Sequence, residues 1–552
     1  MLLSCTSIQP ALVEEEGIVA NNAMVVTAHP LASEVGREIL RKGGNAWDAA
    51  IAVQFALAVV YPVAGNIGGG GFVVFRSHEG VLGSLEFREK APQLASENMY
   101  LDSLGKVVPG KSLAGHLAAG VPGTVDGMVR LHERYGSLPW SALLQPSIIL
   151  AREGYKLSQH DVNNFNQAQS SFLKVSDAQH IFIKRMGWQV GDQMVQYDLA
   201  QTLERIRDQG RYGFYGGETA RLLIDEMERG GGLITTNDLE SYQAQWRDPI
   251  STDYRGYKVI SMAPPSSGGV ALIQLLEGVQ PFDLRTTGFN TYKSIHLITE
   301  VEKRVYADRA TYLGDADFYD VPVGNLISSS YLRARFHDIN LKKVTPSQVI
   351  KEGKVDAIES IQTTHFSIVD AHGNAVSLTT TLNSYFGCKV LVKGAGFFLN
   401  NEMDDFSAKP GIPNQFGLVG SEANAIAPGK RMLSSMTPTI LTKNGKPYLV
   451  LGSPGGSTII TSVFQTIVNV VDHQMNVQTA VNAPRHHHQW LPDRILGEQE
   501  AFTPKVQRQL KKKGYLLEFR GSIGSVNAIL VRQDGRLVGA ADRRGDNQAL
   551  GY

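Results

Sequence analysis

The stretch that decides the fold is Thr363-Thr364-His365-Phe366-Ser367-Ile368-Val369, followed by Asp370-Ala371-His372-Gly373-Asn374 and a second run from Ala375 to Leu382. Two alternating runs that flank a loop of Asp, Gly and Asn predict a β-hairpin. If the loop is Asp370 to Asn374 and the pairing has no bulge, Thr363 lies opposite Thr381. Two hydroxyls then face each other across the ladder, with their Cβ atoms about 5 Å apart.

The threonines of this hairpin also suit an ordinary strand. Threonine is a good strand former, and Thr379-Thr380-Thr381 reads equally well as a pleated surface. On strand propensity alone this ordinary interpretation is favoured. The hairpin by itself therefore predicts local structure and no activity.

The composition is that of a globular protein. Of 552 residues, 43% are hydrophobic and 19% charged, enough for a large core. Lys+Arg and Asp+Glu both number 53, and the absence of a block of like charges argues against nucleic acid or an anionic membrane as partner. The longest apolar stretch, Ala49 to Tyr61, is too short to span a bilayer and predicts a buried helix.

The pattern of residue types along the chain changes after about residue 360. Before it, helical patterns alternate with short β-branched runs and predict helices at Ala32 to Lys42, Gly120 to Tyr135 and Tyr292 to Tyr312. After it, dense alternation with many Thr, Ser and Gly residues predicts packed strands and tight turns. Length alone suggests about 3 to 4 domains, yet no Pro/Ser-rich linker marks a boundary between them.

The two cysteines, Cys5 and Cys388, lie far apart in the sequence and form no disulfide framework. The start Met1-Leu2-Leu3-Ser4-Cys5 is similar to the end of a bacterial lipoprotein signal, although no basic and apolar export region precedes it. A lipid anchor at Cys5 left by a truncated export signal and a chance match both stay open.

Several further motifs accompany the hairpin in a fixed order. They are Gly65-Asn66-Ile67-Gly68-Gly69-Gly70-Gly71-Phe72, Phe87-Arg88-Glu89-Lys90-Ala91-Pro92, Pro264-Pro265-Ser266-Ser267-Gly268-Gly269, Thr381-Leu382-Asn383, Asn400-Asn401-Glu402-Met403-Asp404-Asp405-Phe406, Leu433-Ser434-Ser435-Met436 and Gly452-Ser453-Pro454-Gly455-Gly456-Ser457. From about Met24 to Tyr552 this arrangement resembles the gamma-glutamyltransferase (glutathione hydrolase) family of the N-terminal nucleophile hydrolase superfamily.

The resemblance implies that the chain cuts itself between Gln362 and Thr363. The products would be a large subunit of residues 1–362 and a small catalytic subunit of residues 363–552. A threonine hydroxyl is a weak nucleophile until a base accepts its proton, and the free α-amine created by this cut has a pKa of about 7.7 to 8.0 that suits the task. The implied fold is α+β, a four-layer αββα sandwich built from both subunits, which would explain why the length suggests too many domains.

The resemblance also assigns a substrate with an α-carboxylate, an α-amine and a γ-amide. By this resemblance, the residues that bind the substrate are Arg88, Asn383, Glu402, Asp405, Ser434 and Ser435. Arg88 would hold the carboxylate with its planar fork, assisted by the two serines. Glu402 and Asp405 would bind the ammonium, which the asparagine orients. Without the family, the same residues suit a strand-edge ion pair, helix caps and polar turns.

The implied catalytic residues are Thr363, Thr381, Gly455 and Gly456. Because the two glycines lack side chains, their N–H groups can approach the oxyanion of a tetrahedral intermediate. A phosphate-binding loop is the competing interpretation. Neither the 452–457 motif nor Gly68 to Gly71 is followed by the residues that a P-loop or dinucleotide fingerprint requires, so nucleotide binding is disfavoured.

No cofactor is implied. His486-His487-His488 invites a metal, but consecutive histidines in an extended segment point to alternating sides, which favours packing and hydrogen bonding. The stretch Lys409 to Gly417 resembles the family's substrate lid, with Phe416 where some relatives have Tyr. The loss of that hydroxyl removes one hydrogen bond from the lid and puts its gating in doubt.

The expected function is transfer or hydrolysis of a γ-glutamyl group, with glutathione as the expected donor and water, an amino acid or a dipeptide as acceptor. The alternatives are a related amidase, such as a cephalosporin acylase or a poly-γ-glutamate depolymerase, and a catalytically silent binding paralogue. The two subunits are expected to associate as a heterodimer, and the resemblance implies a periplasmic or secreted protein.

Overall fold

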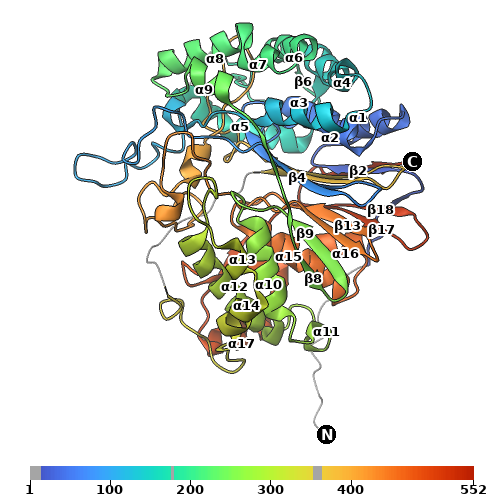
Figure 1. Ribbon diagram of the computed structural model, residues 1–552, viewed down its shortest axis with the longest axis vertical. Coiled ribbons are helices and arrows are strands. Elements are labelled where there is room, and N and C mark those ends of the chain that lie inside the picture. The colour runs from blue at the N-terminus through green and yellow to red at the C-terminus, as the bar shows by residue number, and fades with distance from the viewer. Residues whose placement is uncertain (1–13, 176–179, 352–362) are drawn as a thin grey trace.

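The computed structural model describes residues 14–175, 180–351 and 363–552, so Cys5 and Gln362 lie outside the described residues. At its centre two seven-stranded antiparallel sheets stack face to face, and helices cover the outer face of each (Figure 1). The α+β class predicted from the sequence is confirmed.

One sheet, here the β10 sheet, contains the hairpin. In spatial order its strands are β19 (Gln548–Gly551), β2 (Met24–Thr27), β10 (Thr364–Val369), β11 (Ala375–Thr381), β3 (Gly70–Arg76), β4 (Leu82–Glu86) and β7 (Gln245–Arg247). The predicted register is confirmed along the ladder, from Val369 opposite Ala375 to Thr364 opposite Thr380. Strand β10 begins one residue after Thr363, so this threonine stands at the entrance to the hairpin.

The second sheet, here the β13 sheet, draws on equally distant parts of the chain. Its strands in spatial order are β1 (Ile18–Ala20), β18 (Leu537–Ala541), β17 (Asn527–Val531), β13 (Lys446–Gly452), β12 (Thr439–Lys443), β9 (Tyr257–Ser261) and β8 (Ile250–Tyr254). Two small sheets join β14 (His486–His487) to β15 (Ile495–Glu498) and β16 (Leu517–Arg520), and β5 (Tyr155–Lys156) to β6 (Gln193–Met194). Both large sheets combine strands from before and after Thr363.

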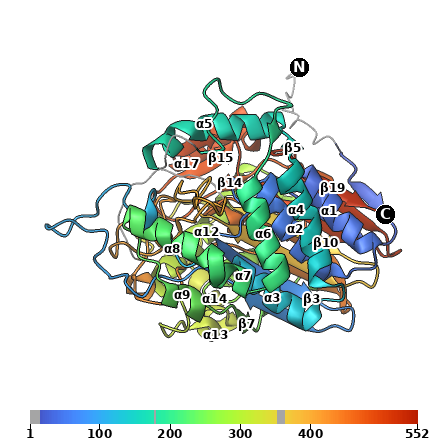
Figure 2. The same ribbon diagram turned by 90° about the horizontal axis from the view of Figure 1, so that it is seen from above.

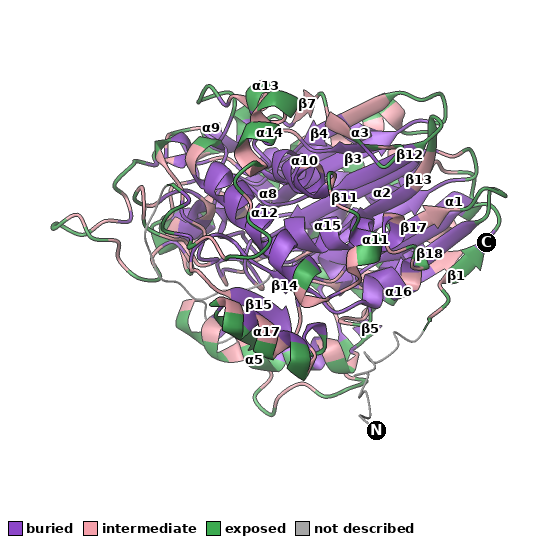
Figure 3. Ribbon diagram, turned by 90° about the horizontal axis from the view of Figure 1, so that it is seen from below, coloured by how far each residue is buried: buried purple, intermediate pink, exposed green. Residues whose placement is uncertain are grey.

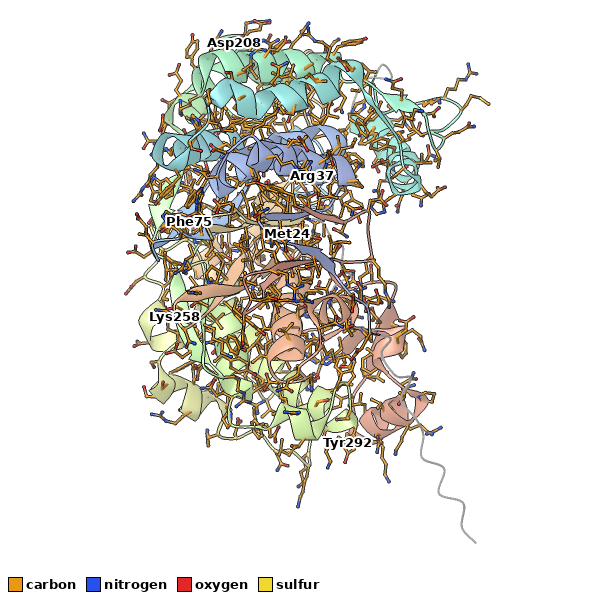
Figure 4. All side chains as sticks on the ribbon, turned by 90° about the vertical axis from the view of Figure 1, so that its right-hand side faces the viewer. Met24, Arg37, Phe75, Asp208, Lys258 and Tyr292 are labelled. Carbon is orange, nitrogen blue, oxygen red and sulfur yellow. The ribbon has the colours of Figure 1, made fainter. Side chains whose placement is uncertain are left out.

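The strands of the β10 sheet are buried on both faces. Met24 and Val26 pack between the sheets, whereas Val25 packs under the helices, as the two-residue period of a strand requires. Figure 4 shows Met24 and Phe75 in the middle of the molecule, with Asp208 and Tyr292 in the two outer layers.

Hydroxyl groups of the hairpin bond to the other sheet. Ser377 Oγ donates to the Leu451 carbonyl at 3.0 Å, and Ser367 Oγ donates to the Asn527 carbonyl at 3.1 Å. The run Thr379–Thr381 is buried as well. These Ser and Thr residues therefore belong to the interior, and Thr379–Thr381 are strand residues of β11, as the ordinary interpretation has them.

Helices cover the outer face of the β10 sheet, as the view from above shows (Figure 2). They are α1 (Pro30–Arg41), α2 (Ala46–Val60), α3 (Thr124–Tyr135), α4 (Trp140–Glu153), α6 (Tyr197–Gln209), α7 (Tyr212–Tyr215), α8 (Gly217–Gly230) and α9 (Thr236–Ser241), with α5 (Gln159–Val175) at the edge. Every residue of α2 is buried, as the apolar stretch predicts. The predicted helix from Gly120 starts only at Thr124, because the preceding residues pair with other loops.

The helices beneath the β13 sheet are α10 (Gly268–Val279), α11 (Leu284–Thr287), α12 (Tyr292–Tyr312), α13 (Val323–Leu326), α14 (Ser329–Phe336), α15 (Thr458–Val471), α16 (Val477–Asn482) and α17 (Pro504–Lys513). Helix α12 has the predicted bounds and is buried from Ser294 to Ala310 (Figure 3). Within residues 14–175, 180–351 and 363–552, no helix combines the length and apolarity needed to cross a membrane.

Candidate active site

Thr363, only 7% exposed, lines a small cavity at the edge of the two sheets. The other lining residues are Arg88, Thr381, Asn383, Glu402, Asp405, Phe416, Leu418, Ser434, Ser435, Met436, Gly456 and Ile459. The structure thus brings together every predicted substrate-binding residue, both threonines and one of the two glycines. Gly455 is absent from this lining among the described residues, because it lies one position back in its turn.

Residues at or just after the ends of strands line the cavity. Arg88 follows β4, Thr381 ends β11, and the turn containing Gly456 joins β13 to α15. A short 3-10 helix, Glu402–Asp405, places its first and last carboxylates toward Arg88. Residues that are far apart in the sequence therefore meet because the two sheets end at the same edge.

Arg88 is the centre of a buried ionic cluster. Its Nη1 lies 2.6 Å from Glu402 Oε2, and its Nη2 lies 2.6 Å from Asp405 Oδ2. Burial raises the pKa of Glu402, and it raises the pKa of Glu89, 3.4 Å from Arg88 Nη1, to about 7. Burial alone would lower the pKa of Arg88, but the three neighbouring carboxylates raise it overall. Sequence reasoning did not assign Glu89 to the site, although it stands within the motif that identified Arg88.

Thr381 and Asn383 form a tight pair. The Asn383 N–H donates to Thr381 Oγ1 at 2.7 Å, and Asn383 Nδ2 donates to the Asn401 carbonyl at 3.0 Å. Asn383 has a φ of 70°, in the left-handed region that asparagine tolerates better than most residues. The Thr381 hydroxyl therefore fixes the chain reversal that aims Asn383 at the cavity.

Arg309, which was not predicted as a site residue, fixes the positions of Ser434 and Ser435 through hydrogen bonds. Arg309 Nη2 donates to Ser435 Oγ at 3.1 Å, and Arg309 Nε donates to Ser267 Oγ at 3.0 Å. Arg309 is one of many charged residues on α12, and nothing in the helical pattern separates it from a surface charge.

The glycine turn precedes α15. Gly455 and Gly456 have φ values of 141° and 53°, which favour glycine. A Cβ at Gly456 would lie 2.7 Å from Phe416 Cδ1, so the ring covers the turn directly. Because α15 starts at Thr458, the positive end of its dipole also faces this region.

Phe416 closes the cavity, as its place in the predicted lid suggests. Its carbonyl accepts a hydrogen bond from Gln489 Nε2 at 3.0 Å, and the neighbouring Asn414 Nδ2 donates to Asp405 Oδ1 at 3.2 Å. The enclosed volume of about 20 Å³ holds little more than one water molecule. A ligand larger than a water molecule can enter only if lining side chains move.

The three consecutive histidines are buried, and the rings of His487 and His488 form hydrogen bonds. His487 Nδ1 bonds to Thr461 Oγ1 at 2.8 Å, and His488 Nε2 lies 3.2 Å from Asp493 Oδ1. Burial lowers the pKa of His486 and His487 to about 3 and that of His488 to about 4. The part of the chain that the structure describes contains no group of three or more side chains arranged to hold a metal ion.

Comparisons with known proteins agree with this geometry. Residues 32–552 match the family model described as Gamma-glutamyltranspeptidase. The Glutathione hydrolase proenzyme of Escherichia coli (strain K12) is 46% identical over 536 residues, covering 97% of this chain and 92% of the relative.

Two solved structures are also similar. The cephalosporin acylase from Bacillus halodurans superposes with a TM-score of 0.86 at 27% identity and covers 100% of this chain and 99% of its own. The Helicobacter pylori gamma-glutamyltranspeptidase is 49% identical, with a TM-score of 0.58, over 60% of this chain and 96% of its own.

Proposed function

The chain belongs to the Gamma-glutamyltranspeptidase family, and we propose that it is a self-processing glutathione hydrolase and γ-glutamyltransferase. It cleaves γ-glutamyl amides through an ester of the γ-glutamyl group with Thr363 and passes that group to water, an amino acid or a dipeptide.

One observation carries this proposal: Thr363 shares a cavity with one guanidinium, two carboxylates and two serine hydroxyls. Together they complement an α-amino acid group. The substrate carboxylate takes the fork of Arg88 and the two serines, and the substrate ammonium takes Glu402 and Asp405. The γ-carbonyl carbon then points toward Thr363.

In the reaction the Thr363 hydroxyl attacks the γ-carbonyl carbon, and its proton passes to the α-amine of the same residue. The N–H groups of Gly455 and Gly456 stabilise the oxyanion, with help from the α15 dipole. Collapse of the intermediate breaks the C–N bond, and the leaving amine takes the proton. Water or an acceptor amine then attacks the ester by the same route and restores the threonine.

Self-processing supplies the free α-amine. The Thr363 hydroxyl attacks the carbonyl carbon of Gln362, and the Gln362–Thr363 C–N bond breaks as the Thr363 nitrogen takes up the proton. Water then hydrolyses the resulting ester, giving subunits of residues 1–362 and 363–552. The subunits stay together as a heterodimer in one four-layer αββα N-terminal nucleophile hydrolase fold. The support is that both sheets interleave strands from the two sides of Thr363.

A related amidase, such as a cephalosporin acylase or a poly-γ-glutamate depolymerase, is the second candidate. The likeness to the Bacillus halodurans structure favours it. Arg88 with Glu402 and Asp405 favours instead a substrate that carries a free α-carboxylate and α-amine. A silent binding paralogue is disfavoured because every position of the catalytic set is filled. A periplasmic or secreted location remains a prediction by resemblance to the family.

The test is incubation of purified protein with γ-glutamyl-p-nitroanilide, with and without glycylglycine. We expect release of p-nitroaniline, and stimulation by the dipeptide would demonstrate transfer in addition to hydrolysis. Absence of release from fully processed protein would contradict the proposal and favour the acylase or the binding paralogue.

A further inference from the structure

Arg309 is a buried cation whose hydrogen bonds go to neutral groups. It is 5% exposed, and its guanidinium donates to the hydroxyls of Ser267 and Ser435. None of the ion pairs within the described part of the chain includes it. A buried charge without an ionic partner is costly to maintain, and burial lowers the pKa of Arg309 accordingly.

Another arginine of the same helix shows the usual arrangement. Arg304 is buried as deeply, but it lies 3.0 Å from Glu300 Oε2 and 2.9 Å from Asp338 Oδ1. Its charge is compensated inside the protein. The charge of Arg309 remains available to an anion that approaches from the cavity.

The hydrogen bonds of Arg309 lead to both serines of the cavity. Arg309 Nη2 occupies a lone pair of Ser435 Oγ, which leaves the hydroxyl hydrogen free to be donated. Arg309 Nε binds Ser267 Oγ, which in turn donates to the Ser434 carbonyl at 2.6 Å. One guanidinium thus orients the Ser435 side chain and the Ser434 backbone.

The charge of Arg309 also reaches the cavity through space. Burial raises the pKa of Asp405, which lines the cavity, and the positive charge of Arg309 lowers it. Arg88, by contrast, is already surrounded by Glu402, Asp405 and Glu89. Arg309 therefore adds positive charge behind the serine side of the cavity, beyond that of Arg88.

We propose that Arg309 is a positioning residue that gives the site its preference for ligands with an α-carboxylate, acting through Ser435 and Ser434. The inference rests on the proposed function, because it identifies the bound anion as the α-carboxylate of the γ-glutamyl group.

The test measures inhibition of γ-glutamyl-p-nitroanilide hydrolysis by three small ligands. L-Glutamate carries both the α-carboxylate and the α-amine, glutarate lacks the α-amine, and 4-aminobutyrate lacks the α-carboxylate. In Arg309→Lys, which cannot contact both serines with one planar group, the inhibition constants of L-glutamate and glutarate should rise about tenfold. That of 4-aminobutyrate should stay unchanged. The matched control, Arg304→Lys, should leave the ratios of the three constants as in the wild type.

Two results would overturn the inference: equal changes for all three ligands, which indicate a general loss of structure, or no change for any. If Arg309→Lys fails to fold, Ser267→Ala serves instead, because it removes the Nε contact and should weaken binding of L-glutamate and glutarate but not of 4-aminobutyrate. An unchanged ratio in that variant likewise overturns the inference. Wild-type protein that releases no p-nitroaniline would instead overturn the proposed function.

Discussion

Arg88 Nη2 donates to Asp405 Oδ2 at 2.6 Å, so the residues assigned to the α-carboxylate and the α-ammonium of the substrate are bound to each other. A zwitterionic α-amino acid group can exchange this ion pair for two of its own, one with Arg88 and one with Asp405. A ligand with a single charge leaves one protein group unpaired in a buried site, which is strongly unfavourable. The pair therefore acts as a selection step for ligands that carry both charges.

Arg88→Lys should raise KM for γ-glutamyl-p-nitroanilide at least about tenfold, because an ammonium cannot reproduce the bidentate contact with a carboxylate. Self-processing should continue, because lysine still neutralises Glu402 and Asp405. The measurement is steady-state kinetics together with gel analysis of the fragments, with Arg41→Lys on the exposed face of α1 as control. An unchanged KM would remove Arg88 from the binding site.

Thr381→Ala should slow self-processing and turnover together. The substitution leaves the buried Asn383 N–H without its acceptor, at a cost of about 1–3 kcal/mol, and relaxes the left-handed turn that aims Asn383. Thr381→Ser keeps the hydroxyl and should behave nearly as the wild type. Time courses of fragment formation on gels test this, and equal rates for the alanine and serine variants would refute the role of the hydroxyl.

Gly456→Ala should lower kcat by about 10²–10³, the usual effect of disturbing an oxyanion site. The added Cβ would lie 2.7 Å from Phe416 Cδ1, so either the turn or the cover must shift. Gly445→Ala is the matched control: its φ of 77° carries similar backbone strain, but no atom lies within 4 Å of the new Cβ. Equal losses of kcat in the two variants would mean that backbone strain alone is responsible.

Much of this could be predicted from the sequence, because the hairpin is a local feature. Its alternation and its Asp370–Asn374 loop determine the register, and the ordered motifs identify the residues of the cavity. The buried charges could not be predicted. Glu300, Lys303 and Arg304 make α12 resemble a surface helix, and ion pairs with one another and with distant loops allow them to lie in the interior.

Acid should destabilise the protein below pH 6.5. Burial lowers the pKa of His486 to about 3, so between pH 6.5 and about 3 the unfolded chain binds a proton that the folded protein does not. Stability therefore falls as the pH falls through this window. His486→Gln should reduce the loss of unfolding free energy between pH 6.5 and 5.5 by about 1 kcal/mol.

Urea titrations at the two pH values measure this difference. The control is His372→Gln, which makes the same substitution at an exposed position of the hairpin loop. An unaltered pH dependence in His486→Gln would show that this histidine is not the titrating group.

The central claim is that Thr363 is both the cleavage point and the nucleophile, and intact-mass analysis with N-terminal sequencing tests it most directly. We predict that purified wild-type protein consists of two chains, the smaller beginning at Thr363, and that Thr363→Ser forms them more slowly. Thr363→Ala should remain one full-length inactive chain, because both attacks need the hydroxyl. A wild-type protein that stays a single chain yet hydrolyses γ-glutamyl amides, or a small fragment that begins at any other residue, would contradict the account.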